Sequence, residues 1–296
     1  MGTLAALAAT ILFSLNGTLS ALAFDLGASP LSMAFWRGLA GGTLLIAGIG
    51  GLCAVRARRP FDGYRPTRRV WAWLGVGVTA VTIENLGLYA AFEHASVLVA
   101  LVCFYIYPVL IGAASVVLGL ERMDARRIGA LIAAFIGCVL VLVGGRDGSG
   151  EIAVAGAALA VIAAVGQTVY VLSARHGFGS VPTPETAVVL NLGPACLLLM
   201  VGLLAGNSGL DPANVSAQLA LIFVVGAVLS QTLPMLLYLT GVRTIGPVDT
   251  AAIALIEPFA GAVVAWLVVG QPFGPLQIAG GALVAGSALL VQQRGD

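Results

Sequence analysis

Ten long apolar stretches follow one another along this chain, with only short charged or turn-rich segments between them. They occupy residues 3–24, 30–54, 69–91, 95–120, 125–144, 152–175, 185–205, 216–241, 247–270 and 275–292. A helix of about 20 mainly apolar residues is long enough to cross the hydrocarbon core of a bilayer. We therefore predict an all-α integral membrane protein with ten transmembrane helices.

The composition agrees with a lipid environment. Charged residues make up 9% of the chain, hydrophobic residues make up 59%, and the mean hydropathy is +1.04. A soluble domain carries about 25% charged residues. A net charge of +1 also excludes a nucleic-acid partner, which would need a dense basic surface.

The basic residues, all arginine, lie on one side of the predicted membrane. If the N-terminus is inside, every arginine except Arg37 and Arg146 falls in a cytoplasmic loop or in the C-terminal tail. Cytoplasmic loops of membrane proteins carry such an excess of positive charge. We therefore expect both termini to be cytoplasmic.

The two halves of the chain share a pattern. The matching landmarks are Tyr89 with Tyr238, 149 residues apart, and Pro108 with Pro258 and Glu121 with Gln271, each 150 residues apart. We assign residues 1–146 and 150–296 to two repeats of five helices each, separated by the linker-like segment 146–150. Because five is odd, the second repeat would be inverted in the membrane relative to the first. Inverted repeats of this kind place a binding site near the middle of the membrane, between the repeats.

Several short motifs resemble a known family. They are Trp36-Arg37 in the second helix, the prolines Pro108 and Pro258, and Leu118-Gly119-Leu120-Glu121-Arg122 at the end of the fourth helix. With the duplication, they resemble the EamA type of the drug/metabolite transporter (DMT) superfamily over essentially the whole chain. The second copy departs from the family pattern at Gln271, where a glutamate is usual, and this favours a structural role for the Glu121 carboxylate.

The resemblance also implies a function. The length and the aromatic-rich fourth helix look most like bacterial amino-acid exporters of the YddG type. This implies an alternating-access secondary transporter in the bacterial inner membrane. Its substrates would be small solutes, chiefly amino acids with aromatic or other apolar side chains and related metabolites.

Two glutamates lie deep in the predicted membrane. Glu84 is in the third helix, and Glu257 is near the middle of the ninth, directly before Pro258. A charged carboxylate is costly in hydrocarbon, so both are candidates to bind a cationic group or to take up a proton. Pro258 should free the carbonyl of Ala254 and kink the helix. Glu257 could instead be a packed, protonated acid beside this kink. We expect Pro258 and its counterpart Pro108 to act as hinges.

Neutral polar residues complete the predicted binding cavity. Besides Glu84 and Glu257, the candidates are Asn16, Asn85, Tyr89, Tyr107, Gln167, Tyr170, Gln231 and Tyr238. Each alone could instead join two helices, but they gather in the first, third, fourth, sixth, eighth and ninth helices. On a continuous helix Tyr105 and Tyr107 would point about 200° apart, so we expect only Tyr107 to face the cavity.

Arg37 is the only basic residue that lies away from the ends of a predicted span. We expect it to brace helices by pairing with a carboxylate or with carbonyls at a helix end, and a clamp for a ligand carboxylate is the alternative. Phosphorylated substrates would need several cations. The cavity therefore suits a small, neutral or zwitterionic solute with an apolar side chain.

The sequence contains no motif for catalysis, a metal or a cofactor. The four cysteines are isolated, and His94 and His176 lie at predicted loops. We therefore expect no enzyme activity and no cofactor. The expected partners are a small-molecule substrate and the lipid bilayer, for a protein that could act as a monomer. A flippase for lipids or polyprenyl carriers is the main alternative function.

Overall fold

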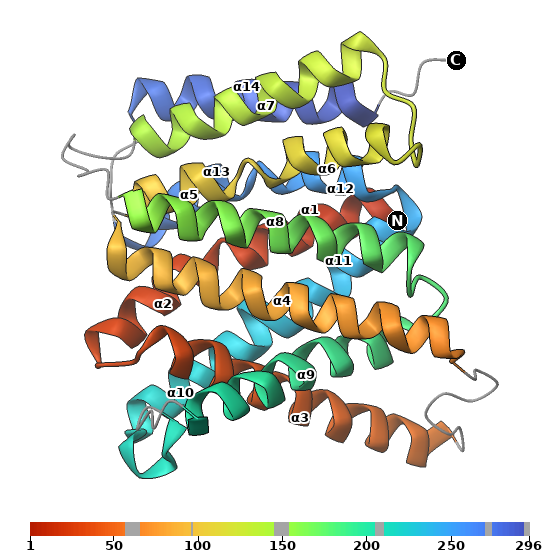
Figure 1. Ribbon diagram of the computed structural model, residues 1–296. Coiled ribbons are helices and arrows are strands. Elements are labelled where there is room, and N and C mark those ends of the chain that lie inside the picture. The colour runs from red at the N-terminus through yellow and green to blue at the C-terminus, as the bar shows by residue number, and fades with distance from the viewer. Residues whose placement is uncertain (57–65, 96, 145–153, 205–209, 270–273, 293–296) are drawn as a thin grey trace.

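The computed structural model describes residues 1–56, 66–95, 97–144, 154–204, 210–269 and 274–292, and within these ranges it contains helices and connecting turns but no strands (Figure 1). In chain order the elements are α1 (Gly2–Phe13), α2 (Leu15–Asp25), α3 (Pro30–Arg56), α4 (Arg68–His94), α5 (Val97–Phe104), α6 (Tyr107–Val117), α7 (Ala125–Gly144), α8 (Val154–His176), α9 (Thr183–Leu204), η2 (Pro212–Asn214), α10 (Ala217–Ala227), η3 (Val228–Thr232), α11 (Leu233–Thr244), α12 (Pro247–Ala254), α13 (Glu257–Val269) and α14 (Pro275–Gln292). The all-α prediction is confirmed.

The spans agree with a membrane protein. Nine segments of the described chain are long and apolar enough to cross a membrane, and the remaining one, Pro275–Leu290, is a shorter apolar helix. Large aliphatic side chains are exposed on the outside of the bundle, including Val117 at 83% and Leu203 at 71%. A soluble protein would bury such side chains, whereas a lipid-facing surface consists of them.

Two spans are broken at matching places. α5 ends at Phe104 and α6 begins at Tyr107, and α12 ends at Ala254 and α13 begins at Glu257. Pro108 and Pro258 each follow such a break, in the first turn of the new helix, where the missing N–H of proline costs nothing. The sequence predicted a kink within a continuous helix. That expectation was wrong in detail, because the helix ends before each proline and starts again.

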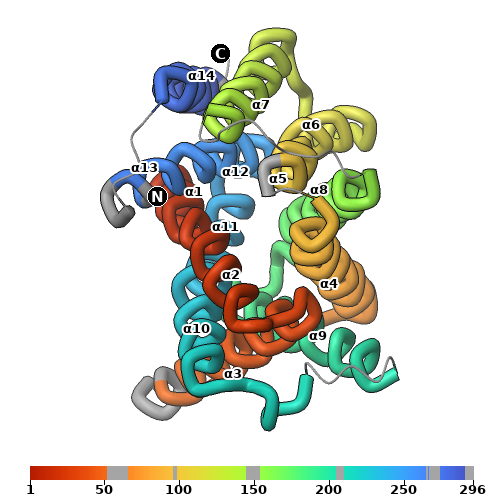
Figure 2. The backbone as a smooth tube through the Cα atoms, turned by 90° about the vertical axis from the view of Figure 1, so that its left-hand side faces the viewer, coloured from red at the N-terminus to blue at the C-terminus, as the bar shows by residue number. Residues whose placement is uncertain are grey.

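The helices pack in pairs, each of which joins a helix from the first half of the chain to one from the second half. α1 lies against α11 and α8 lies against α4, while α3 packs on α9 and α7 packs on α14 (Figures 1 and 2). Glycines permit the close contacts, as small residues do between membrane helices. A Cβ atom at Gly166 in α8 would lie 2.8 Å from the carbonyl oxygen of Ala80 in α4, and one at Gly137 in α7 would lie 2.8 Å from the carbonyl oxygen of Gly280 in α14.

Some of the segments used in the sequence analysis lie outside the described residues. They include the 146–150 linker, which contains Arg146. They also include Gln271, three arginines of the loop after α3 (Arg58, Arg59 and Arg65), and Arg294 in the C-terminal tail.

Candidate functional site: a polar cavity within the bundle

A cavity of about 590 Å³ lies inside the bundle. Figure 2 looks along the helices and shows α1, α2 and α11 facing α4, α5 and α8 across the centre. The volume falls within the range of about 300–1,000 Å³ that is usual for small-molecule sites. Its lining comes mainly from the first, third, fourth, sixth, eighth and ninth spans, and the second span contributes Arg37.

The structure brings all ten predicted binding residues together in the lining of this one cavity. They are Asn16, Glu84, Asn85, Tyr89, Tyr107, Gln167, Tyr170, Gln231, Tyr238 and Glu257. Of the two predicted hinge residues, Pro258 also lines the cavity, whereas Pro108 is buried and does not contribute to the lining.

The position of Tyr105 contradicts the expectation that only Tyr107 faces the cavity. It lines the cavity together with Tyr107, and the centroids of the two rings are 6.4 Å apart. The predicted separation of about 200° assumed a continuous helix. Because Tyr105 lies in the break between α5 and α6, that geometry does not apply, and both rings face the same space. The ring of Phe104 lies 5.2 Å from that of Tyr107 and extends this aromatic wall.

Arg37 forms the most extensive hydrogen-bond network of the cavity, although its side chain is only 1% exposed. Nη1 donates to the Oδ1 atom of Asn16 and to the hydroxyl oxygen of Tyr89, both at 2.6 Å. Nη2 donates to Oγ of Ser230 at 2.8 Å and, more weakly, to the carbonyl oxygens of Ser230 and Gly226 at 3.3 and 3.4 Å. Of the two braces expected for Arg37, the described part of the chain therefore shows carbonyls, together with neutral side chains, and no carboxylate.

The backbone of the eighth span provides both space and a hydrogen-bond acceptor for the guanidinium of Arg37. Its middle, η3, is a wider π-helical turn between α10 and α11, of the kind often found at functional sites. Pro234 has no N–H, so the carbonyl of Ser230, four residues earlier, is left free to accept from Arg37. A Cβ atom at Gly226 would lie 3.2 Å from Nε of Arg37, so the missing side chain makes room for it.

Ser230 and Gly226 are functional candidates that the sequence analysis missed. The available signal was the spacing from Ser230 to Pro234, which leaves one carbonyl without its helical partner. The π-helical turn itself has no clear mark in the sequence.

The two carboxyl groups of the cavity form no ion pair with the guanidinium in the described chain. Within the described chain, neither Glu84 nor Glu257 forms an ion pair, and Glu84 accepts only a long hydrogen bond, 3.4 Å, from the amide of Asn85. Tyr170 is 4% exposed, and its hydroxyl group is buried without a hydrogen-bond partner among the described residues. A buried polar group without a partner costs free energy unless a ligand or water satisfies it. The cavity therefore offers unsatisfied polar groups to a guest.

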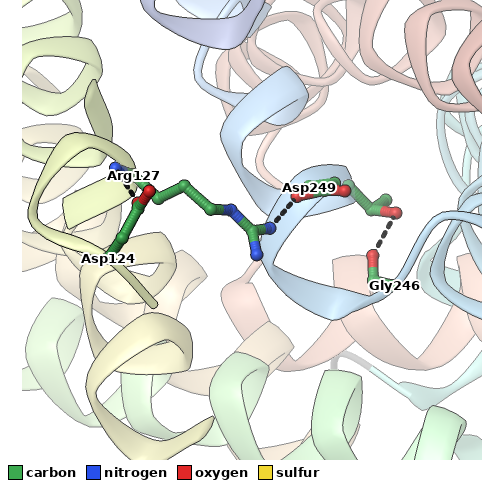
Figure 3. A network of polar contacts seen from close by, with 5 residues as sticks. Asp124, Arg127, Gly246 and Asp249 are labelled. Atoms are coloured by element: carbon green, nitrogen blue, oxygen red, sulfur yellow. Dashed lines mark hydrogen bonds and ion pairs between the residues drawn. The ribbon is translucent and has the colours of Figure 1, made fainter. Parts of the chain in front are cut away.

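The cavity is open toward one end of the bundle and closed at the other. It reaches three exposed residues of α2, which are Gly17 and Thr18 near the start of this helix and Asp25 at its end. At the opposite end, Arg127 in α7 and Asp249 in α12 point toward one another and form an ion pair (Figure 3). This pair joins segments 122 residues apart.

A second arginine ties together helices at the closed end. Nη1 of Arg243, near the end of α11, donates to the carbonyl oxygen of Val181 at 2.6 Å and to Oγ1 of Thr183 at 2.9 Å. Nη2 donates to Oγ1 of Thr186 at 2.9 Å. These bonds attach the end of the eighth span to the connection between α8 and α9.

Comparisons with known proteins agree with this architecture. The chain is 22% identical over 284 residues to YcbK of Bacillus subtilis (strain 168), an uncharacterized transporter, with 94% of this chain and 88% of that protein covered. It superposes on a crystal structure of another protein with a TM-score of 0.78 at 20% identity, over 98% of this chain and 96% of that one, which shows a shared fold. The profile of the EamA-like transporter family matches residues 1–143 and 154–292. The chain belongs to the EamA-like transporter family.

Proposed function

We propose that this membrane transporter exports small solutes by alternating access, and that its substrates are amino acids with aromatic or other apolar side chains and related metabolites. The observation that carries the proposal is the cavity, which combines one guanidinium, two carboxyl groups without an ion pair in the described chain, and an aromatic wall. Such a lining matches the ammonium, carboxylate and side chain of a zwitterion. The cavity reaches the exposed Asp25 at one end of the bundle, and the ion pair of Arg127 and Asp249 lies at the other end, as expected for one state of an alternating-access cycle.

The proposed topology follows from the arginines and the packing. Both termini are cytoplasmic, and the membrane is the bacterial inner membrane. Residues 1–146 and 150–296 are inverted repeats, a proposal supported by the reciprocal packing of α1 on α11 and α8 on α4 and by the matching breaks before Pro108 and Pro258. In this orientation the cavity opens to the outside, and the Arg127–Asp249 pair closes the cytoplasmic end.

The proposed cycle uses the broken spans. A solute enters the cavity, and its apolar part packs against the rings of Phe104, Tyr105 and Tyr107. The half-helices on either side of Pro108 and Pro258 then change their relative angle, which closes one end and opens the other. The helix breaks lower the free-energy cost of this movement, because few backbone hydrogen bonds cross them.

A counterflow experiment tests the proposal. Purified protein is reconstituted into liposomes loaded with unlabelled phenylalanine, and the uptake of labelled phenylalanine is measured against protein-free liposomes. Saturable uptake that competes with other apolar amino acids, but not with sugar phosphates, is expected. Lipid scrambling without uptake of any amino acid would contradict the proposal and support a flippase.

A binding measurement on the same preparation supplies a control. A ligand selective for the folded state raises the melting temperature by mass action. Phenylalanine should stabilise the wild type more than it stabilises Gln231→Leu, which removes one amide from the cavity. An equal shift in both would argue that binding occurs elsewhere.

A further inference from the structure

Arg37 differs from an ordinary helix brace in the chemistry of its partners. All of the hydrogen bonds of its two Nη atoms go to neutral oxygens, of Asn16, Tyr89, Ser230 and Gly226. Its Nε atom is buried without a partner among the residues that the structure describes. A buried guanidinium without a paired carboxylate keeps its full positive charge in a poorly screened environment. The wall of the cavity is therefore electropositive at this point.

The partners of Arg37 are oriented by its hydrogen-bond chemistry. A guanidinium has five donors and no acceptor. Asn16 must therefore present its amide oxygen to Arg37, and Tyr89 must present its hydroxyl oxygen. Arg37 uses neither the NH2 group of Asn16 nor the O–H hydrogen of Tyr89. The side chains of Asn16 and Ser20 lie within hydrogen-bonding reach of the Tyr89 hydroxyl, and Asn16 and Tyr89 both line the cavity.

We propose that Asn16 and Tyr89, oriented and polarised by Arg37, form a subsite that binds the carboxylate group of the substrate. This inference rests on the proposed function and adds the group by which the substrate is recognised. Arg37 acts as a positioning residue, since both of its Nη atoms already donate to the protein, while Asn16 and Tyr89 make the contacts. Hydrogen bonds to an ionised acceptor are stronger than those between neutral groups, so the discrimination is chemical as well as steric.

The other charged groups of the cavity suit the opposite end of a zwitterion. Glu84 and Glu257 line the cavity without a paired cation in the described chain, and both are available for an ammonium group. Asp25 lies at the exposed mouth. The lining thus contains acidic groups as well as the donor subsite, with Glu84 close enough to Arg37 to interact with it electrostatically and Glu257 in the ninth span.

The test compares acids with their neutral amides. Binding of phenylalanine, phenylalaninamide, 3-phenylpropionate and 3-phenylpropionamide to the purified full-length protein is measured by the shift in melting temperature. The wild type should bind each acid at least about ten-fold more tightly than its amide, because the amide replaces an anionic oxygen with a donor. Equal binding of acid and amide, or no binding of either acid, would overturn the inference.

Two variants that keep Arg37 test the contacts of Asn16 and Tyr89 separately, and a third variant is the control. Asn16→Asp changes a donor into an anionic acceptor of the same shape and should reverse the preference, so that phenylalaninamide binds better than phenylalanine. Tyr89→Phe should weaken both acids about ten-fold and affect the amides less. Gln218→Glu adds a carboxylate at an exposed position of α10 and should leave the acid-to-amide ratio unchanged. If Asn16 has a purely structural role, Asn16→Asp should leave the acid preferred over its amide.

Failure of the inference can be told apart from failure of the proposed function. Phenylalanine counterflow without discrimination between acid and amide would leave the transport proposal standing and remove the subsite. Discrimination without counterflow of any amino acid would keep the subsite and remove the transport proposal.

Discussion

Arg127 and Asp249 form an ion pair between the first turns of α7 and α12, at the end of the bundle opposite the mouth of the cavity (Figure 3). The side chains are 14% and 6% exposed, so solvent screens the pair only in part. Asp249 also lies where the dipole of α12 favours a negative charge, whereas Arg127 lies at the N-terminus of α7, where a positive charge is disfavoured. The pair therefore compensates an otherwise unfavourable position and joins the two halves of the chain.

Removing this pair should open the closed end. Arg127→Gln removes an interaction of about 1–3 kcal/mol that exists only while α7 and α12 are together. In a background without native cysteines, a reporter Thr250→Cys lies in α12 directly after Asp249, at a position that is fully buried. We expect the rate of maleimide labelling of this cysteine in detergent to rise about ten-fold, which corresponds to about 1.4 kcal/mol.

The controls use the same charge changes. Arg122→Gln removes an exposed arginine near the same end and should leave the labelling rate unchanged. The exchanged pair, Arg127→Asp with Asp249→Arg, should restore slow labelling. Labelling that is equally slow in Arg127→Gln and in the wild type would show that the pair does not hold this end closed.

Pro108 and Pro258 should matter for the rate of transport more than for stability. Each lies in the first turn after a helix break, so replacing both by alanine supplies the N–H groups that would let the two half-helices join. We expect the double variant to fold and bind phenylalanine, with counterflow slowed about ten-fold or more. Pro212→Ala, in the exposed η2 turn, is the control and should transport normally. Normal counterflow in the double variant would place the hinges elsewhere.

The sequence predicted the spans and most of the cavity because both depend on a strong local signal. Apolar runs of spanning length identify the helices, and a polar side chain at membrane depth is costly enough to be informative by itself. All ten residues chosen in this way line one cavity.

The missed residues depend on departures from a regular helix or on distant contacts. Tyr105 faces the cavity because the backbone breaks between α5 and α6, and helical periodicity cannot anticipate a break. Ser230 accepts from Arg37, 193 residues away, through a carbonyl freed by Pro234 and a π-helical turn. Local propensity carries no information about a partner so distant in the sequence.

Gly166 should be intolerant of substitution. A Cβ atom there would lie 2.8 Å from the carbonyl oxygen of Ala80 and 3.0 Å from the backbone nitrogen of Glu84, and backbone atoms cannot rotate away. Gly166→Ala should therefore separate α8 from α4 and lower the free energy of unfolding by about 1–3 kcal/mol. Gly286→Ala in α14 is the matched control, since no atom lies within 4 Å of its added Cβ. At position 286 the higher helix propensity of alanine should raise the free energy of unfolding by up to about 1 kcal/mol. Thermal unfolding of the two variants in detergent measures the difference. Equal losses of stability in both would contradict the close packing of α4 on α8.

Glu257 is the residue most suited to couple transport to protons. It lies at the start of α13, directly after the break in the ninth span, and it faces the cavity without a paired cation in the described chain. A change in the angle between α12 and α13 would expose its carboxyl group to either end of the cavity in turn, as proton exchange requires. We expect wild-type counterflow of a neutral amino acid to be accelerated when the compartment opposite the labelled substrate is acidic. Glu257→Gln keeps the shape but cannot carry the proton, so it should exchange substrate at a rate independent of the pH gradient.

The matched control for this experiment is Glu93→Gln, which removes an exposed carboxyl group at the end of α4 and should respond to the gradient as the wild type does. Gradient-insensitive exchange in both the wild type and Glu257→Gln would mean that solutes leave by facilitated exchange. In that case the carboxyl group would act only on the ammonium group of the substrate. Glu257→Gln should then weaken the binding of phenylalanine and leave that of 3-phenylpropionate, which has no ammonium group, unchanged. A proton-coupling role predicts instead that the response to the gradient is lost, so the two assays together assign one role to Glu257.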